Sequence, residues 1–355
     1  MATTDAPPLP SAAAPARNIF AELLSKYGLF AVLLALPVFY GIKDLRDQGD
    51  LSPLATNIFQ GLSNGSIWAL IAVGYTLVYG IIELINFAHG ENFMIGSFVS
   101  AGLWGTLGLT LATGPLGLVL GLLLTLIVAM VTCGSLNVMI EKVAYRPLRN
   151  APKLAPLITA VGFSFSLQNV GLLWLGGSPA GVPDLLRAQD EVATIIGIRI
   201  QRADILAILV TIPLVIAMVT FINKSRLGKA MRATAQDPDA ARLQGINVDT
   251  TISLTFLIGG MLAGAAGLIY ALYQTTIWFF QGFQAGLIAF TAAVMGGIGN
   301  LKGAVLGGLI IGVIQQISDS RIGSEWTPAI VFGYLVLVMV FRPQGLIGEE
   351  TREAG

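Results

Sequence analysis

The polar stretch Glu83–Asn92, ELINFAHGEN, contains the residue types best suited to acid–base chemistry or ligand binding. It holds the only histidine of the chain, His89, together with Asn86, Glu91 and Asn92. One histidine needs several well-placed carboxylates to complete a metal site, and none lies at the i, i+4 spacing, so we expect no metal. Two interpretations stay open: these residues belong to a pathway or gate, or they cap helix ends in an ordinary turn.

The second polar stretch, Gly296–Gly303, reads GGIGNLKG and is as rich in glycine as a phosphate-binding loop. It lacks the spacing G-x-x-x-x-G-K-[ST] and no strand is expected before it, so the sequence predicts no nucleotide site here. We interpret it as a flexible turn between two short helices. Its candidate pathway residues are Gly296, Gly297, Gly299 and Asn300.

Catalysis is not expected from this chain. The polar segments contain no nucleophile elbow and no pair of carboxylates arranged for acid–base work. We therefore predict no catalytic residues, no metal and no cofactor bound by the chain itself.

The longest polar interruption, Lys224–Asn247, carries its own folding signals. Its charged residues are mostly basic: Lys224, Arg226, Lys229, Arg232 and Arg242, against Asp237 and Asp239. Asp237 is a good N-cap, Pro238 suits the first helical position, and Asp239 falls in the first turn that the helix dipole favours. Gly245 is placed to end the helix in a left-handed conformation. The segment predicts a helix of about two turns, too short to be stable without a surface to lie against.

Composition indicates a polytopic membrane protein of the all-α class. Of 355 residues, 55% are hydrophobic and only 11% charged, with a mean hydropathy of +0.77. A soluble domain carries about 25% charged residues. The net charge of zero argues against a nucleic-acid partner, and the single cysteine, Cys133, allows no disulfide within the chain.

Hydropathy predicts about ten spans, in contact with membrane lipid along their length. They are approximately Tyr27–Ile42, Leu54–Ile82, Phe93–Ala112, Leu116–Ile140, Leu154–Leu175, Ala203–Ile222, Thr250–Tyr273, Phe283–Met295, Val305–Ile317 and Thr327–Phe341. The eighth and ninth are too short for simple spanning helices, and we interpret them as half-helices around the Gly296–Gly303 turn. The expected domains are a disordered N-terminal tail (1–25), a transmembrane permease domain (26–348) with the polar segment 224–247, and a C-terminal tail (349–355).

Charge predicts the orientation of these spans. The loop Glu141–Lys153 and the segment Lys224–Asn247 are strongly basic, and basic loops stay in the cytoplasm. The remaining loops are balanced or slightly acidic: Lys43–Asp50, Asp184–Arg202 and Ser318–Glu325. Ten spans with both termini in the cytoplasm satisfy this pattern. Spans two to five and seven to ten then run in opposite senses, which predicts an inverted repeat.

Glycines recur at four-residue spacing within the apolar runs: Gly117/Gly121, Gly260/Gly264, Gly303/Gly307 and Gly308/Gly312. Small residues at this spacing allow helices to approach closely in lipid. We expect most of them to serve packing within one bundle, with a subunit interface as the alternative for some.

Several separated stretches together resemble the permease of branched-chain amino acid ABC importers (the LivH type). They are GYTLVYGI at Gly74–Ile81, INFAHGE at Ile85–Glu91, EKVAYRPLR at Glu141–Arg149, RLGKAMRATAQDPDAARLQGI at Arg226–Ile246, and FTAAVMGGIGNLKGAVLGG at Phe290–Gly308. The resemblance covers about residues 55–348. It implies a chain in the bacterial cytoplasmic (inner) membrane that pairs with a second, similar permease.

The resemblance also implies further partners and roles. Two cytoplasmic ATPase subunits would bind ATP and magnesium, and an extracytoplasmic solute-binding protein would deliver the solute. Asp237–Gln244 would be the coupling helix. The residues expected to couple it to an ATPase are Lys229, Arg232, Asp237, Pro238, Asp239, Arg242 and Gly245. Branched-chain or other neutral amino acids are the expected solutes.

Alternative functions stay open from the sequence. Permeases with similar motifs move urea or short amides. An ion-coupled secondary transporter would need acids deep within a span, whereas the candidates Glu83 and Glu91 lie at a span end. A passive channel would leave the capped helix of Lys224–Asn247 without a role.

Overall fold

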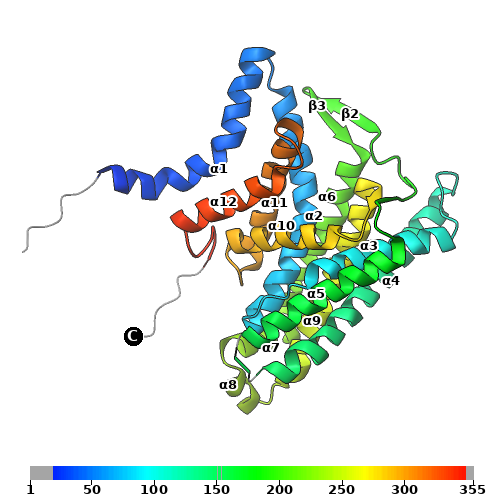
Figure 1. Cartoon of the computed structure of the whole chain (residues 1–355), viewed down its shortest axis with the longest axis vertical. Coiled ribbons are helices and arrows are strands. Elements are labelled where there is room, and N and C mark those ends of the chain that lie inside the picture. The colour runs from blue at the N-terminus through cyan, green and yellow to red at the C-terminus, as the bar shows by residue number, and fades with distance from the viewer. Residues whose placement is uncertain (1–18, 150, 153, 349–355) are drawn as a thin grey trace, which may run out of the picture.

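The chain folds into a bundle of helices (Figure 1), shown by a computed structural model that describes residues 19–149, 151–152 and 154–348. The first half contains α1 (Ile19–Asp47), α2 (Ser52–Ile82), α3 (His89–Thr106), α4 (Pro115–Ile140), α5 (Leu154–Leu175) and α6 (Arg202–Lys224). The second half contains α7 (Arg226–Gln236), α8 (Pro238–Leu243), α9 (Val248–Gln274), α10 (Gln281–Gly296), α11 (Leu301–Arg321) and α12 (Thr327–Phe341).

Short helical turns and short strands lie at the two ends of the bundle. After α4 the chain continues as the π-turn Glu141–Tyr145 and then as the 3-10 turn Arg146–Leu148. Strand β2 (Glu191–Ile195) pairs antiparallel with β3 (Ile198–Gln201), and β1 (Ala180–Gly181) pairs antiparallel with β4 (Thr276–Ile277). We call the end with the β2–β3 hairpin the hairpin end. The opposite end, which carries Glu141–Leu148, α7 and α8, is the basic end.

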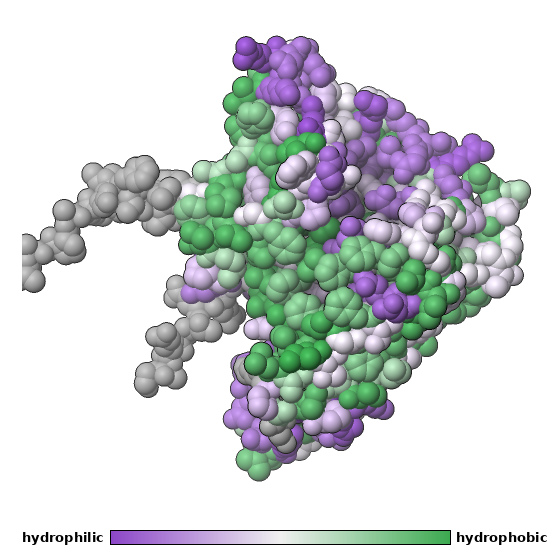
Figure 2. Space-filling model, in the orientation of Figure 1, coloured by the Kyte–Doolittle hydropathy of each residue, from purple (hydrophilic) through white to green (hydrophobic). Residues whose placement is uncertain are grey.

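The helices confirm the prediction of an all-α polytopic membrane protein. Within the described residues, seven are long and apolar enough to cross a membrane: α1, α2, α4, α5, α6, α9 and α11. Figure 2 shows hydrophilic residues gathered at the two ends and a mostly hydrophobic surface between them. The number of ten spans and the side on which each terminus lies stay predictions.

The ninth predicted span, Val305–Ile317, is longer in the structure than the sequence suggested. Helix α11 has 21 residues and is long enough to span a membrane, so its interpretation as a half-helix is wrong. Asn300 caps its start by accepting hydrogen bonds from the backbone N–H groups of Lys302 and Gly303. The polar residues in the first and last turns lower the hydropathy there, although the backbone stays helical through Arg321.

The predicted terminal tails fall mostly outside the described residues. Helix α1 begins at Ile19, so residues 1–18 of the predicted N-terminal tail and all of 349–355 lie beyond what the structure describes. Arg17, a basic residue of that tail, and Lys153, the last residue of the basic loop Glu141–Lys153, lie outside it as well. The division into tails and a permease domain stays a prediction.

Glycine faces let the central helices touch through their backbones. On α11, a Cβ added to Gly312 would lie 2.2 Å from Gly65 Cα of α2. On α9, a Cβ added to Gly264 would lie 2.5 Å from the Ala129 carbonyl oxygen of α4. Gly303 and Gly307 face α10 in the same way, so three of the four predicted pairs pack helices within the chain.

The fourth pair behaves differently. A Cβ at Gly117 or Gly121 would first meet the side chain of Thr113 or Leu109, which precede α4, and not the backbone of another helix. Close helix packing inside the chain is therefore not the role of Gly117 and Gly121.

The two halves of the bundle exchange packing partners. Helix α2 packs along α11, and its counterpart α9 packs along α4. Helix α3 contacts α9, α4 and α5, while its counterpart α10 contacts α2, α11 and α12. This exchange is the pattern that the predicted repeat of spans two to five and seven to ten requires.

The junctions between these helices repeat as well. Helix α2 ends at Glu83 with φ 52°, and α9 ends at Thr275 with φ 53°, both in the left-handed conformation. Each is followed by a short turn and then by α3 or α10. The two new helices cross at a pair of glycines, because a Cβ on Gly90 would lie 2.2 Å from the Gly282 carbonyl oxygen. The polar stretch that begins at Glu83 thus has a structural counterpart beginning at Thr275.

We predict that Gly312→Val destabilises the chain by about 1–3 kcal/mol, the usual cost of overpacking a tight contact. The added carbons have no room between α11 and α2, so the two helices must separate. Gly333→Val on α12 is the matched control, because a Cβ there meets nothing within 4 Å. Thermal denaturation of the detergent-purified chains measures the difference, and equal melting temperatures for the two variants would contradict the prediction.

Candidate functional site

The predicted pathway residues of the first polar stretch dip into the bundle. Asn86, His89, Glu91 and Asn92 are all at most 1% exposed. They lie in the turn before α3 and in its first helical turn, enclosed by α2, α4, α9 and α10. A solvent-exposed turn is therefore excluded for them, although capping and hydrogen bonding within the bundle are not.

An amide network ties this turn to the core. The side-chain nitrogen of Asn86 donates to Asn137 Oδ1 of α4 at 2.9 Å, and the Asn137 nitrogen donates to the Phe256 carbonyl of α9 at 2.7 Å. The Tyr145 hydroxyl donates to the Ile85 carbonyl at 3.1 Å. Asn86 consequently acts as a structural bridge, because its partners come from separate elements.

Asn92 pairs with α4 through the only cysteine. Its side-chain nitrogen donates to the Cys133 carbonyl at 3.0 Å, and the Cys133 thiol donates to the Asn92 carbonyl at 3.2 Å. These reciprocal bonds fasten the first turn of α3 to α4, although Asn92 Oδ1 has no hydrogen-bond partner within the described residues.

His89 and Glu91 are the polar groups that the described residues leave least satisfied. Within the described residues, neither ring nitrogen of His89 and neither carboxylate oxygen of Glu91 makes a hydrogen bond of standard geometry. The His89 ring packs edge-on against Tyr75, with centroids 4.6 Å apart, and occupies the space beside Gly74. Ser164 of α5 lies beside the Glu91 carboxylate. Buried polar groups with spare hydrogen-bonding capacity are candidates for a role beyond packing.

The glycine turn lies apart from this group. Gly297 and Gly299 have φ of 106° and 96°, which side chains with a Cβ rarely adopt. Asn300 also donates to the Ile347 carbonyl at 2.8 Å, so the segment after α12 holds the turn in place. The Ile347 N–H in turn donates to the Gly296 carbonyl at 3.0 Å.

A cavity of about 580 Å³ joins the turn to the polar segment at the basic end. Its lining includes Gly299, Asn300 and Lys302 at the turn and the start of α11, Arg232 of α7 and Thr76 of α2. Its size falls within the usual range of small-molecule sites, roughly 300–1,000 Å³. The structure thus brings Arg232 together with the candidate residues of the turn, and keeps both apart from His89.

The capping signals of the polar segment are confirmed. Asp237 Oδ1 accepts hydrogen bonds from the N–H groups of Asp239 and Ala240, both at 2.9 Å. Pro238 is the first residue of α8, and Gly245, just beyond the end of that helix, has the left-handed φ of 81°. Asn247 then caps α9 by accepting from the Thr250 N–H at 3.0 Å. Each of these bonds joins neighbours in sequence, which is why the sequence predicts them.

The basic residues of the segment have separate local environments. Arg232 donates to the carbonyls of Ile222 and Asn223 at the end of α6, which fastens α7 to α6. Arg242 pairs with Asp239 at 2.8 Å on the exposed surface of α8, where such a pair contributes little stability. Lys229 is exposed on α7.

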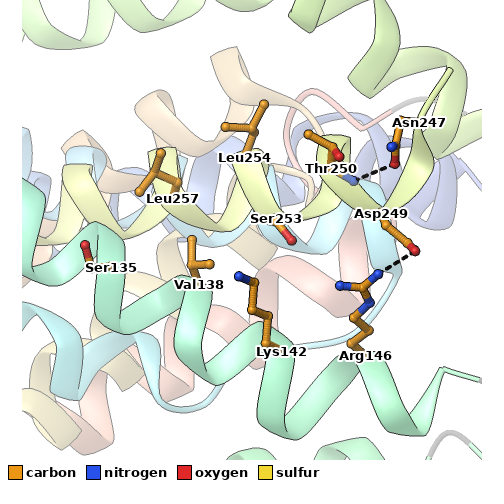
Figure 3. Close-up of a pocket in the computed structure, with 10 residues that line it drawn as sticks. All are labelled: Ser135, Val138, Lys142, Arg146, Asn247, Asp249, Thr250, Ser253, Leu254 and Leu257. Carbon is orange, nitrogen blue, oxygen red and sulfur yellow. Dashed lines mark hydrogen bonds and ion pairs between the residues drawn. The ribbon is translucent and has the colours of Figure 1, made fainter.

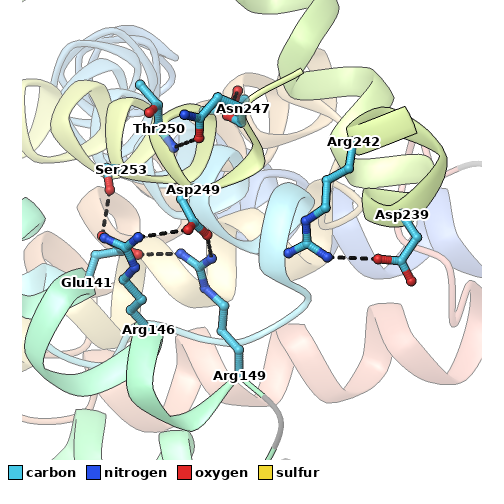
Figure 4. Close-up of polar contacts among 10 residues, drawn as sticks. Glu141, Arg146, Arg149, Asp239, Arg242, Asn247, Asp249, Thr250 and Ser253 are labelled. Carbon is cyan, nitrogen blue, oxygen red and sulfur yellow. Dashed lines mark hydrogen bonds and ion pairs between the residues drawn. The ribbon is translucent and has the colours of Figure 1, made fainter. Parts of the chain in front are cut away.

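A charged cluster that the sequence analysis did not single out lies next to α8 (Figure 4). Arg149 donates to Glu141 at 2.5 Å and to Asp249 at 2.5 Å, and Arg146 donates to Asp249 at 2.7 Å. Ser253 donates to the second Glu141 oxygen at 2.7 Å. We call these five residues the clamp. It fastens the turns after α4 to the first turns of α9.

One sequence signal could have pointed to the clamp. Glu141 ends a long apolar run and is followed by Arg146 and Arg149, yet these arginines indicated only which side of the membrane the loop faces. The Glu141 side chain is fully buried, and a buried carboxylate requires a partner. The Glu141 partner Arg149 is near in sequence, but Asp249, which Arg149 also contacts, is distant, so no local pattern connects it.

No metal site is evident among the residues that the structure describes, since they contain no group of three or more His, Cys, Asp or Glu side chains placed to hold an ion. The polar groups present can donate and accept hydrogen bonds and can carry charge at the two ends. With a bundle of apolar helices, this arrangement defines a polytopic membrane protein whose polar interior and basic end are the candidate functional regions.

The particular family follows from comparison with known proteins. Residues 57–340 match the family of the branched-chain amino acid transport system permease component, and the chain belongs to this family. Its relatives are transport permease components and not enzymes.

The similarity extends over most of the chain. The high-affinity branched-chain amino acid transport system permease proteins BraD of Pseudomonas aeruginosa and LivH of Escherichia coli are each 40% identical to it, over 83% of this chain and 96% of theirs. LivM of Salmonella typhimurium, a permease of the same kind of system, is 26% identical over 79% of this chain and 68% of its own. A solved structure, PsaBC from Streptococcus pneumoniae in complex with Fab, aligns with a TM-score of 0.42, 12% identity and coverage of 89% of this chain and 98% of that one, too low to support an inference.

Proposed function

We propose that the chain is the permease subunit of an ATP-driven ABC importer in the bacterial cytoplasmic (inner) membrane. It translocates branched-chain or other neutral amino acids that an extracytoplasmic binding protein delivers. A second homologous permease and two cytoplasmic ATPase subunits complete the importer. ATP and magnesium bind to the ATPase subunits, and this chain needs no cofactor of its own.

The exposed tip of α8 is the observation that carries the proposal. Leu243 is 88% exposed, next to the charged pair Asp239 and Arg242. A leucine displayed on a six-residue helix that cannot fold alone indicates a partner surface. Ala241, on the opposite side, is buried, and α8 contacts α7 and α9, so α8 packs against the bundle.

The clamp gives this tip a route into the core. A force on α8 reaches α9 through the short connection at Asn247, which caps α9. Asp249 and Ser253 of α9 are bonded to Arg149 and Glu141, so α4 must follow. Closure of an ATPase dimer would then shift the equilibrium between two arrangements of the bundle. In this proposal the predicted coupling residues act at the tip and the clamp transmits their motion.

We assign His89, Glu91 and the residues of the glycine turn to the translocation pathway because of their polarity and their position in the bundle. His89 and Glu91 offer unsatisfied hydrogen-bonding groups within the bundle. The cavity lined by Gly299, Asn300 and Arg232 opens at the basic end, next to α7. Lys302 and Arg232 would attract the carboxylate of a departing amino acid.

The test is a gentle-detergent purification of the wild-type chain followed by an ATPase assay. We expect a nucleotide-binding subunit to co-purify with ATPase activity. A clean, inactive single chain from cells that express the complete transport system would overturn the proposal.

Uptake measurements separate the remaining functions. An importer stops when cellular ATP is depleted and continues in the presence of an uncoupler. An ion-coupled transporter shows the reverse, and a passive channel continues under both conditions. Competition of labelled leucine uptake by isoleucine and valine, and not by urea or acetamide, supports amino acids as the solutes.

A further inference from the structure

A groove of about 560 Å³ runs along the outside of the bundle between the end of α4 and the start of α9 (Figure 3). Lys142 and Arg146 stand at one end and extend from the α4 side toward α9. Val138, Leu254 and Leu257 line the part that leads away from them. The groove is therefore charged at its mouth and mostly apolar beyond it, with Ser135 at the far end.

The length of the groove matches one leaflet of a bilayer. On α9 it is lined from Asn247 to Leu257, which is about 15 Å at 1.5 Å per residue. The hydrocarbon core of a bilayer is about 30 Å thick, so 15 Å is half of it. The mouth lies at the level of the clamp, where the helices meet water, and the apolar part extends toward the middle of the membrane.

The charges at the mouth are not balanced. Asp249 lines the groove too, but its two oxygens already accept from Arg146 and Arg149. Lys142 forms no ion pair within the part of the chain that the structure describes. An unpaired ammonium beside a neutralised carboxylate favours an anionic ligand.

The groove opens sideways toward lipid. Neighbouring apolar residues of α4 and of the π-turn after it point out of the bundle, with Val131 54%, Met139 49% and Val143 57% exposed. An acyl chain can therefore enter the groove from the membrane, whereas a water-soluble anion would gain nothing from Leu254 and Leu257.

We propose that this groove is a binding site for an anionic phospholipid of the leaflet at the basic end. The phosphate lies against Lys142 and Arg146, and an acyl chain lies along Val138, Leu254 and Leu257. Basic pockets between helices at the cytoplasmic side are suited to such headgroups. The site goes beyond the proposed function and does not depend on it, because it requires only a membrane with acidic lipid. A bound lipid would also cover the seam between α4 and α9 that the clamp closes.

The first experiment is native mass spectrometry of the full chain titrated with dioleoyl-phosphatidylglycerol or dioleoyl-phosphatidylcholine. We expect the anionic lipid to bind more tightly to the wild type. Lys142→Gln should weaken that binding about five-fold, the effect of removing one basic residue near an anionic surface. Lys224→Gln is the charge-matched control, because Lys224 is exposed at the end of α6 and does not line the groove. Equal affinities of both variants would overturn the proposal.

A second measurement locates the acyl chain. A phosphatidylglycerol with a photoreactive diazirine on one acyl chain should label peptides of α4 and α9, and Leu254→Trp, which fills the groove, should abolish that labelling. Labelling elsewhere would place the lipid outside the groove and refute the site. Displacement of the lipid by millimolar glycerol phosphate would show a free-phosphate site instead. Exclusion of the lipid by a co-purified second permease would show that the groove is a subunit interface. Either result would also refute the lipid assignment.

Discussion

Replacing Asp237 and Asp239 together by lysine should reduce amino acid uptake to background and release the ATPase subunits. Asp237 accepts the two N–H groups that begin α8, and loss of such a cap costs about 1 kcal/mol. Lysines there also place positive charge at the positive end of the helix dipole. A helix of six residues has little else to hold its shape, so the surface that displays Leu243 is lost.

The measurement combines labelled leucine uptake in cells with recovery of the ATPase subunits on the tagged permease. The amount of permease in the membrane fraction must match the wild type, so that loss of uptake is not loss of the chain. Asp190→Lys is a suitable control, because Asp190 is an exposed acid at the hairpin end. Full recovery of the ATPase with the double lysine variant would count against α8 as the coupling helix.

Replacing Arg149 by leucine should destabilise the chain by about 3–5 kcal/mol, the usual cost of removing one partner of a buried ion pair. The Glu141 side chain is fully buried and, within the described residues, would retain only the Ser253 hydroxyl as its hydrogen-bond donor. Denaturation of the detergent-purified chain, followed by tryptophan fluorescence, measures the change in the free energy of unfolding.

Two further variants distinguish the clamp from an ordinary surface pair. Arg202→Leu removes a pair with Asp190 in which both side chains are 49% exposed, and we expect a cost below about 1 kcal/mol. Glu141→Leu combined with Arg149→Leu should be more stable than Arg149→Leu alone, because no buried charge is left unpaired. If Arg149→Leu costs no more than Arg202→Leu, the clamp does not fasten α4 to α9.

A transport assay extends this test to function. The clamp lies between the tip of α8 and the core, so variants that fold but lack it should bind ATPase subunits and transport poorly. The Glu141→Leu/Arg149→Leu chain is the suitable one to measure, since its stability is expected to be partly restored. If the clamp transmits motion, this variant should bind the ATPase subunits normally and yet take up little amino acid.

Much of the architecture could be predicted because its causes are local. A run of apolar residues is sufficient to indicate a membrane helix, whatever it packs against. The capped helix α8 was equally accessible, since Asp237, Pro238 and Gly245 act on neighbours within a few residues. Where polar residues lie within a helix, hydropathy predicted too short a span. Helix α11 extends to Arg321 because its backbone hydrogen bonds continue through these polar residues.

The sequence by itself determined the all-α membrane class, the basic loops, the caps of the segment after α6 and the family motifs, because each depends on residues that are close together in the chain. Only the tertiary structure decided which distant groups meet. It buried His89 beside Tyr75 and Gly74, joined Asn86 to Asn137, and placed Arg149 between Glu141 and Asp249. The physical reason is that a buried polar group must find its partner wherever packing brings one within hydrogen-bonding distance, and that partner can come from any helix of the bundle.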